Sequence, residues 1–219
     1  MKKAFLCAVL VLMCVSSAFG CTTEELLKAV QDKNTTPKMI ENLIKAGADV
    51  NAKNKDSSTA LMWAAYHKSN PEVVNVLIKA GADVNAKNKN DGSTALTLAA
   101  RYNINPEVVN VLIKAGADVN AKTYGGFPYG KTALMFAAGG NSNPEIWNAL
   151  INAGANINAK DNIGMTALMY AASNNINPEA VNALIKAGAD IFAKDNEGKT
   201  VLDYAKNDEI KRIILNAAK

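Results

Sequence analysis

The sequence predicts an all-α repeat solenoid, in which short helical units stack in a row instead of enclosing one globular core. The string AGADVNAK begins at Ala46, Ala80 and Ala115, and variants of it begin at Ala153 and Ala187. A second string, TALMWAA, begins at Thr59 and recurs with changes at Thr94, Thr132, Thr166 and Thr200. The repeat period is 34 to 38 residues, which is typical of stacked supersecondary units.

Residues 59–87 illustrate one unit. Thr59 is expected to cap a first helix that ends near residues 66–67. In Asn70-Pro71-Glu72 the asparagine is a good N-cap, the proline suits the first helical position and the glutamate complements the positive helix start. Gly81 ends this second helix, and residues 83–85 extend toward the next unit. The predicted unit is therefore helix, turn, helix and extended loop.

These strings resemble the ankyrin repeat over essentially all of residues 22–219. The Thr-Ala-Leu-x-x-Ala-Ala block, the Val-Val-x-x-Leu-Ile helix and the Gly-Ala-Asp-Val-Asn-Ala hairpin carry the resemblance. Methionine or threonine replaces the histidine of the family's Thr-Pro-Leu-His, so we expect methionine packing there. The resemblance implies helix-turn-helix units joined by β-hairpin-like loops. We count six helix pairs in residues 21–219, with polar first and last pairs as caps and a Thr22-x-x-Glu25 capping box near the start.

Residues 1–20 have the pattern of a secretory signal peptide. A short basic start precedes twelve apolar residues, 4–15, which are too few to span a bilayer. Cleavage after Gly20 would make Cys21 the N-terminus and remove the other two of the three cysteines. The sequence before Cys21 is similar to a bacterial lipobox, with departures at Ala18 and Phe19. Lipidation of Cys21 and an unmodified cysteine are both open, and we expect an exported protein of the periplasm, envelope or exterior.

Charge and composition argue against several classes of function. Lys2 and Lys3 lie in the predicted signal peptide, so the formal net charge falls from +4 to about +2 without it, and no basic stripe suggests nucleic-acid binding. The single histidine, His67, is expected to be a solvated surface residue with no partners for a catalytic triad or metal. The pairs Asp161-Asn162 and Asp195-Asn196 are expected to be turn residues, not calcium ligands. We expect no cofactor, no metal and no enzymatic activity.

The aromatic residues indicate a protein-binding surface. The ankyrin geometry places the inner helices and the loop tips on one concave groove, where partner proteins bind, and aromatic residues with arginine dominate such interfaces. Two candidate columns follow the inner helices, and a third group lies on the long loop 123-TYGGFPYGK-131. The candidates are Trp63, Tyr66, Arg101, Phe136, Tyr170 and Tyr204 in the columns, and Tyr124, Phe127 and Tyr129 on the loop. The column aromatics serve either packing or binding, and the loop rings point either outward or down into the groove.

The sequence thus favours a monomeric, non-enzymatic module that binds another protein through the groove and the hairpin tips. One alternative is an envelope structural or protective protein held to the membrane by lipidated Cys21. Another is a secreted effector that acts on host proteins, which differs from the first only in its destination.

Overall fold

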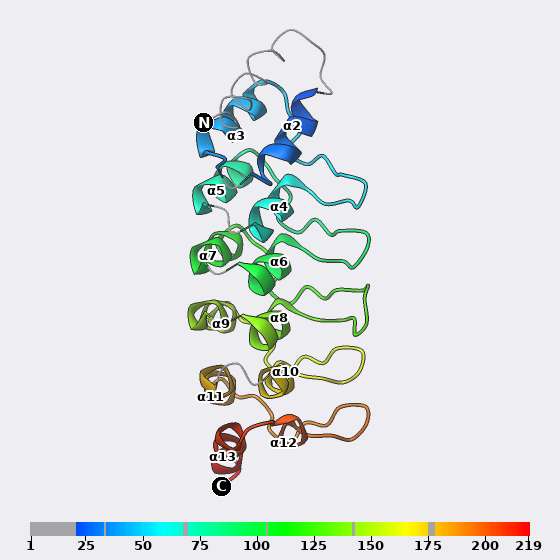
Figure 1. Ribbon diagram of the computed structural model, residues 1–219, viewed down its shortest axis with the longest axis vertical. Helices are drawn as coiled ribbons and strands as arrows, with labels where there is room; N and C mark the ends of the chain where they lie inside the picture. Colours follow the sequence, from blue (N-terminus) through cyan, green and yellow to red (C-terminus); the bar gives the residue numbers. More distant parts are fainter. Residues whose placement is uncertain (1–20, 33, 68–69, 104, 142, 175–177) are drawn as a thin grey trace.

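The computed structural model describes residues 21–219 except 33, 68–69, 104, 142 and 175–177. Its helices lie in two parallel columns, and the loops project from one of them (Figure 1). The inner column, which carries the loops, contains α2 (Cys21–Ala29), α4 (Ala60–Tyr66), α6 (Ala95–Tyr102), α8 (Ala133–Gly140), α10 (Ala167–Asn174) and α12 (Val201–Tyr204). The outer column contains α3 (Pro37–Lys45), α5 (Pro71–Lys79), α7 (Pro106–Lys114), α9 (Pro144–Asn152), α11 (Pro178–Lys186) and α13 (Asp208–Ala217). No strand occurs in the described residues, and the predicted all-α repeat solenoid is confirmed.

The helices begin where their capping residues place them. The Thr59 side chain accepts a hydrogen bond from the Met62 backbone N–H, and Asn70 accepts one from that of Glu72, as the sequence predicts. Thr94 and Thr97 form a reciprocal capping box, in which the Thr97 hydroxyl accepts from the Thr94 N–H at 2.8 Å. Local residue choice therefore fixes the ends of these helices.

One hydrophobic cluster extends along the stack from Leu26 in α2 to Ile214 in α13. Met62 and Met135, at the position of the family histidine, are each only 1% exposed, so the predicted methionine packing is confirmed. Trp147 occupies a position held by valine in α5 and α7 and is 1% exposed. Its indole N–H donates to a backbone carbonyl of α8 at 3.0 Å, which satisfies the polar atom that the core would otherwise bury unpaired.

A ladder of asparagines links successive hairpins. Asn85 donates to the Gly116 carbonyl at 3.0 Å and accepts from the Asp118 N–H at 2.8 Å, both in the next unit. Asn51, Asn120 and Asn158 make the same pair of bonds to the units that follow them. We call these four residues the asparagine ladder. At the next equivalent position the chain has Phe192, where the described fold has no further hairpin to bond.

The N-terminal part departs from one expectation. Helix α2 begins at Cys21, so Thr22 lies inside the helix and does not precede it, and the predicted Thr22-x-x-Glu25 capping box is wrong. The Thr23 hydroxyl instead accepts a hydrogen bond from the Asp49 N–H in the first hairpin, at 3.1 Å. The predicted signal peptide, residues 1–20, lies outside the described residues. Among the residues described, no helix combines the length and the apolar character that a bilayer span requires.

Candidate protein-binding surface

The predicted column residues form a continuous row across the inner helices. The Tyr66 ring lies 4.7 Å from the Tyr102 ring, measured between centroids. The Arg101 guanidinium lies 4.8 Å from the Tyr102 ring and 5.1 Å from the Phe136 ring. The Lys131 ammonium continues the row, 5.7 Å from Phe136 and 4.4 Å from the Tyr170 ring. We call this set the aromatic–cation row. Its cations lie over π-faces, which attract positive charge.

Sequence reasoning missed two members of this row, Tyr102 and Lys131. Tyr102 follows Arg101 directly and is 37% exposed. Lys131 precedes the Thr132 N-cap, at a position where the preceding units have Ser58 and Ser93. Comparing that single position between units would have identified Lys131 as a change from a small polar residue to a cation.

Trp63 and His67 form a stacked pair at one end of the row. Their ring centroids are 5.4 Å apart with nearly parallel planes, and Tyr66 meets both rings edge-on. The His67 Nε2 atom is buried without a hydrogen-bond partner, and burial lowers the pKa of His67 below its usual value. The expectation that His67 is a solvated surface residue holds only in part, because the side chain is half-buried against the rings of Trp63 and Tyr66.

Tyr170 and Tyr204 are tied to the loops by hydrogen bonds. The Tyr170 hydroxyl donates to an Asp161 carboxylate oxygen at 2.6 Å, and Tyr204 donates to Asp195 in the same way. Burial, together with the Asp161 bond, raises the pKa of Tyr170, and the Asp195 bond raises the pKa of Tyr204 to about 12. The other Asp161 oxygen accepts from the backbone of the turn, at Ile163 and Met165, as expected of a turn residue. These two tyrosines therefore help to hold the loop tips against the inner helices.

A hollow of about 750 Å³ opens between α8, α10 and the long loop. Its wall includes Phe136, Tyr170, Tyr204 and Pro128, with three cations, Arg101, Lys131 and Lys206. Helix α8 ends in Gly139-Gly140. The position of Gly139 is occupied by Tyr66 in α4 and by Arg101 in α6. Room is left beside Gly140, where an added Cβ would meet no atom within 4 Å, whereas at Gly139 it would lie 3.3 Å from the Tyr170 Cβ.

The long loop is held from both sides by its neighbours. The backbone N–H of Tyr124 donates to the Asp91 carbonyl at 2.9 Å, and the Tyr129 carbonyl accepts from the Asn162 N–H at 3.0 Å. The Tyr124 hydroxyl also donates to the Asn88 carbonyl at 2.6 Å. A Cβ on Gly125 would lie 2.0 Å from a backbone oxygen of the preceding loop, so this close approach requires glycine.

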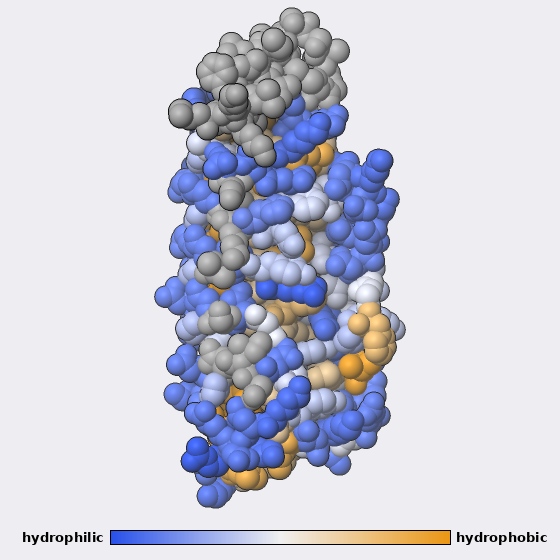
Figure 2. Space-filling view, viewed as in Figure 1, coloured by the Kyte–Doolittle hydropathy of each residue, from blue (hydrophilic) through white to orange (hydrophobic). Residues whose placement is uncertain are grey.

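The three rings of the loop differ in exposure. Tyr124 is 53% exposed and Tyr129 49%, whereas Phe127 is 81% exposed. Figure 2 shows apolar atoms gathered near the loop tips beside α8 and α10, on a face that is otherwise mostly hydrophilic. Large exposed apolar side chains at a loop tip are typical of contact sites.

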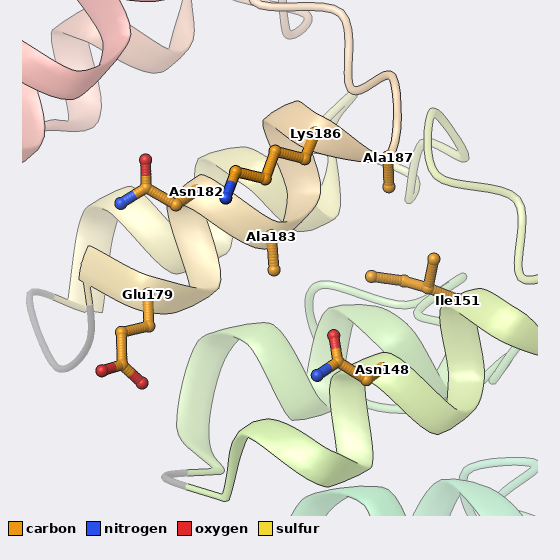
Figure 3. A pocket seen from close by; sticks show the side chains of 7 residues that line it. All are labelled: Asn148, Ile151, Glu179, Asn182, Ala183, Lys186 and Ala187. Atoms are coloured by element: carbon orange, nitrogen blue, oxygen red, sulfur yellow. The ribbon is translucent and has the colours of Figure 1, made fainter.

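A second hollow, of about 670 Å³, lies between the outer helices α9 and α11 (Figure 3). It is lined by Asn148 and Ile151 of α9 and by Ala183 and Lys186 of α11, among others. Ala183 takes a position held by valine in α5 and α7, which leaves this seam less filled. None of the predicted binding residues lines it. Within the described residues, no group of three or more histidines, cysteines or carboxylates is placed to hold a metal ion.

Comparison with known proteins agrees with this geometry. A family model of ankyrin repeats (3 copies) matches residues 26–123 and again residues 134–219. The chain belongs to the ankyrin-repeat family. Ankyrin repeats are protein-interaction modules, and the family is generally a non-enzymatic binding scaffold. The ten residues between the two matches contain most of the long loop, which is therefore the segment that departs from the family pattern.

Two solved structures illustrate the likeness. One is a chain of the complex described as the Bd0816 predatory endopeptidase from Bdellovibrio bacteriovorus with immunity protein Bd3460, at 30% identity and a TM-score of 0.75. The match covers 87% of this ankyrin chain and 96% of that one. The other is the ankyrin repeat domain of Bcl-3, described as a unique member of the IkappaB protein family, at 29% identity and a TM-score of 0.72. That match covers 87% and 81% of the two chains. A comparison with curated proteins gives no match.

Proposed function

We propose that this ankyrin protein is an exported, non-enzymatic module that captures one protein partner between its aromatic–cation row and the long loop 123–131. The observation that carries the proposal is Phe127, an apolar ring that is 81% exposed at the tip of a loop fixed on both sides. The fold gives that ring nothing to cover, so packing within the chain does not account for it.

The ordering of the loop makes Phe127 an effective contact. Binding costs free energy when flexible side chains and loops must be immobilised. Here the bonds from Tyr124 and Tyr129 to the adjacent loops have already fixed the backbone. An aromatic side chain buries about 150–250 Å², and at about 25 cal/mol per Å² a fully covered Phe127 would contribute on the order of 4–6 kcal/mol before other costs.

The test compares two exposed phenylalanines. Phe127→Ala removes the loop ring, and Phe192→Ala removes a ring that is 70% exposed on a different hairpin. Each variant is expressed in the cells from which the protein comes, crosslinked in the intact cells and analysed by mass spectrometry for the captured partner. We expect Phe127→Ala to reduce capture at least about tenfold, while Phe192→Ala and the melting temperatures of both variants stay near wild type. Equal capture by wild type and Phe127→Ala would refute the role of the loop.

A second candidate function is protection of the producing cell from an exported enzyme, by a protein anchored at Cys21. The likeness to a chain in an endopeptidase–immunity protein complex favours this candidate, because both chains of that complex engage another protein. A lipid anchor predicts partition of the protein into a detergent phase, which Cys21→Ser would abolish. Recovery of the wild-type protein in the aqueous phase would remove the anchor from this candidate. A secreted effector would instead be found in the culture medium.

A further inference from the structure

The hollow between α8, α10 and the long loop concentrates positive charge. Arg101, Lys131 and Lys206 line it, and no carboxylate belongs to its wall. Within the described part of the chain none of these three cations is in an ion pair, although other lysines are paired with glutamates. The charges are therefore left for a ligand or for solvent.

The carboxylates closest to this wall are already engaged. Asp161 bonds the Tyr170 hydroxyl through one oxygen and backbone N–H groups through the other, and it is 7% exposed. Asp195 has the same arrangement with Tyr204 and the next turn, at 8% exposure. Neither side chain can turn to neutralise Arg101 or Lys131 without giving up several hydrogen bonds.

Two of the cations share one aromatic ring. Arg101 and Lys131 lie 5.1 Å and 5.7 Å from the centroid of Phe136. Burial lowers the pKa of Lys131, and the charge of Arg101 lowers it further, against an opposing effect of Asp161. An anion placed between the two cations would relieve this repulsion, and the partial burial of Lys131 would strengthen its attraction to that side chain.

The remaining wall suits a peptide better than a nucleic acid. Pro128, Phe136 and Ile163, each partly exposed, add apolar surface, and the open space beside Gly140 lets a backbone approach closely. The cations gather at one hollow and form no stripe along the stack, and the formal net charge of the whole chain is only +4. The volume of about 750 Å³ is within the range of pockets that hold a short segment or ligand.

We propose that this hollow receives an acidic segment of the protein partner, with an aspartate or glutamate carboxylate held between Arg101 and Lys131 and an apolar side chain against Pro128 and Ile163. The inference rests on the proposed function and specifies the chemistry of the partner at that surface.

The experiment places a photoreactive benzoylphenylalanine in the full-length chain at position 140 or at position 127. Gly140 faces open space and Phe127 is exposed, so both positions accept the probe without repacking. After irradiation in intact cells, mass spectrometry identifies the partner segment attached at each position. We expect position 140 to yield a segment of another protein that carries at least two acidic residues and a net negative charge.

The captured segment is then synthesised twice, as found and with every Asp and Glu replaced by Asn and Gln, and titrated calorimetrically. We expect the wild-type protein to bind the amide peptide at least about fivefold more weakly than the native peptide. The Lys131→Gln and Arg101→Gln variants should show a similar loss of affinity for the native peptide. Lys114→Gln, an equal charge change on the exposed surface of α7, should leave the affinity unchanged. If either Arg101→Gln or Lys131→Gln folds poorly, the other variant still provides the test.

Several outcomes would overturn the inference. A neutral or basic segment, nucleic acid or a second copy of this chain at position 140 would each do so, as would equal affinity for the acidic and amide peptides. Crosslinking at position 127 without any at position 140 would refute the acidic-segment inference but not the proposed function. Absence of a crosslinked partner at both positions would refute the inference and the proposed function.

Discussion

Replacing Asn85 with alanine tests whether the asparagine ladder holds the units together. The change removes two bonds to the next unit, the donation to Gly116 and the acceptance from Asp118, and leaves the backbone of its own turn intact. A net contribution of about 0.5–1.5 kcal/mol for each bond, at the lower end because Asn85 is exposed and water can replace it, gives a loss of about 1–2 kcal/mol.

The matched control is Phe192→Ala. Phe192 occupies the equivalent hairpin position, and its backbone N–H donates to Asp190 at 2.9 Å just as that of Asn85 donates to Asp83. Because no hairpin follows it in the described fold, the alanine there removes no bond between units. We expect its free energy of unfolding to stay within about 0.5 kcal/mol of wild type.

Urea denaturation followed by circular dichroism measures both variants. Asn85→Ala should lower the midpoint without changing the slope if the stack still unfolds as one unit, and lower the melting temperature by about 2–6 °C. Amide hydrogen exchange adds a local readout, because the Asp118 N–H loses its acceptor and should exchange faster, while that of Asp190 should not change. Equal losses in Asn85→Ala and Phe192→Ala would refute the reasoning, since the effect would then belong to the loop and not to the link.

Three further predictions address the core, the long loop and the pH profile. Trp147→Phe should cost about 1–2 kcal/mol in urea melts, because it leaves a void in the core and removes the indole bond to the Ala137 carbonyl, which keeps only its bond from the Asn141 N–H; a loss below about 0.5 kcal/mol would contradict this. Gly92→Ala should destabilise by at least about 1 kcal/mol, because φ is +72° and the new Cβ would lie 2.4 Å from the Tyr124 ring, and removal of that ring in a double variant should recover part of the loss. Tyr204, whose folded pKa is raised to about 12 by its bond to Asp195, stabilises the fold fully below its ordinary value of 10.0 and loses this contribution as pH rises toward 12. Tyr204→Phe should therefore flatten the stability profile across that window, and an unchanged slope would count against the bond.

Features set by neighbouring residues could be predicted from the sequence. Thr59 and Asn70 cap their helices through atoms two or three residues away, so the local string determines the contact. The buried alanines of the inner helices, such as Ala65 and Ala100, recur in successive units, because every unit places the same position against the next unit. The burial of Met62 under its neighbours was predictable for the same reason.

Features that join one unit to another could not be derived in this way. Tyr124 is anchored by Asn88, 36 residues earlier, and its ring lies against Gly92, so only the completed stack fixes the direction of the loop. Exposure of His67 depends on the stacking of Trp63, which a lone histidine in a string does not reveal. The bond from Tyr170 to Asp161 spans nine residues and recurs between Tyr204 and Asp195 in the last unit, but a nine-residue spacing across a turn and a helix start indicates no contact until the fold is known.

The asparagine ladder and the long loop occupy different parts of the segment that joins α7 to α8. The residue that links the units, Asn120, is therefore separate from the proposed contact residue, Phe127. The interval from Ala115 to Thr132 is the longest between any hairpin and its next helix, yet Asn120 still accepts from the Asn156 N–H at 2.7 Å and donates to the Gly154 carbonyl. The insertion begins only after that residue, at 123, and its ends rejoin through a bond from the Gly130 N–H to the Thr123 carbonyl at 2.8 Å. Because the asparagine link is complete before the loop departs, a change at the loop tip, such as one at Phe127, leaves that link intact. The same order of elements places Phe127 beyond the ladder on the loop that borders the cationic hollow, so a partner can contact both without displacing any residue of the asparagine ladder.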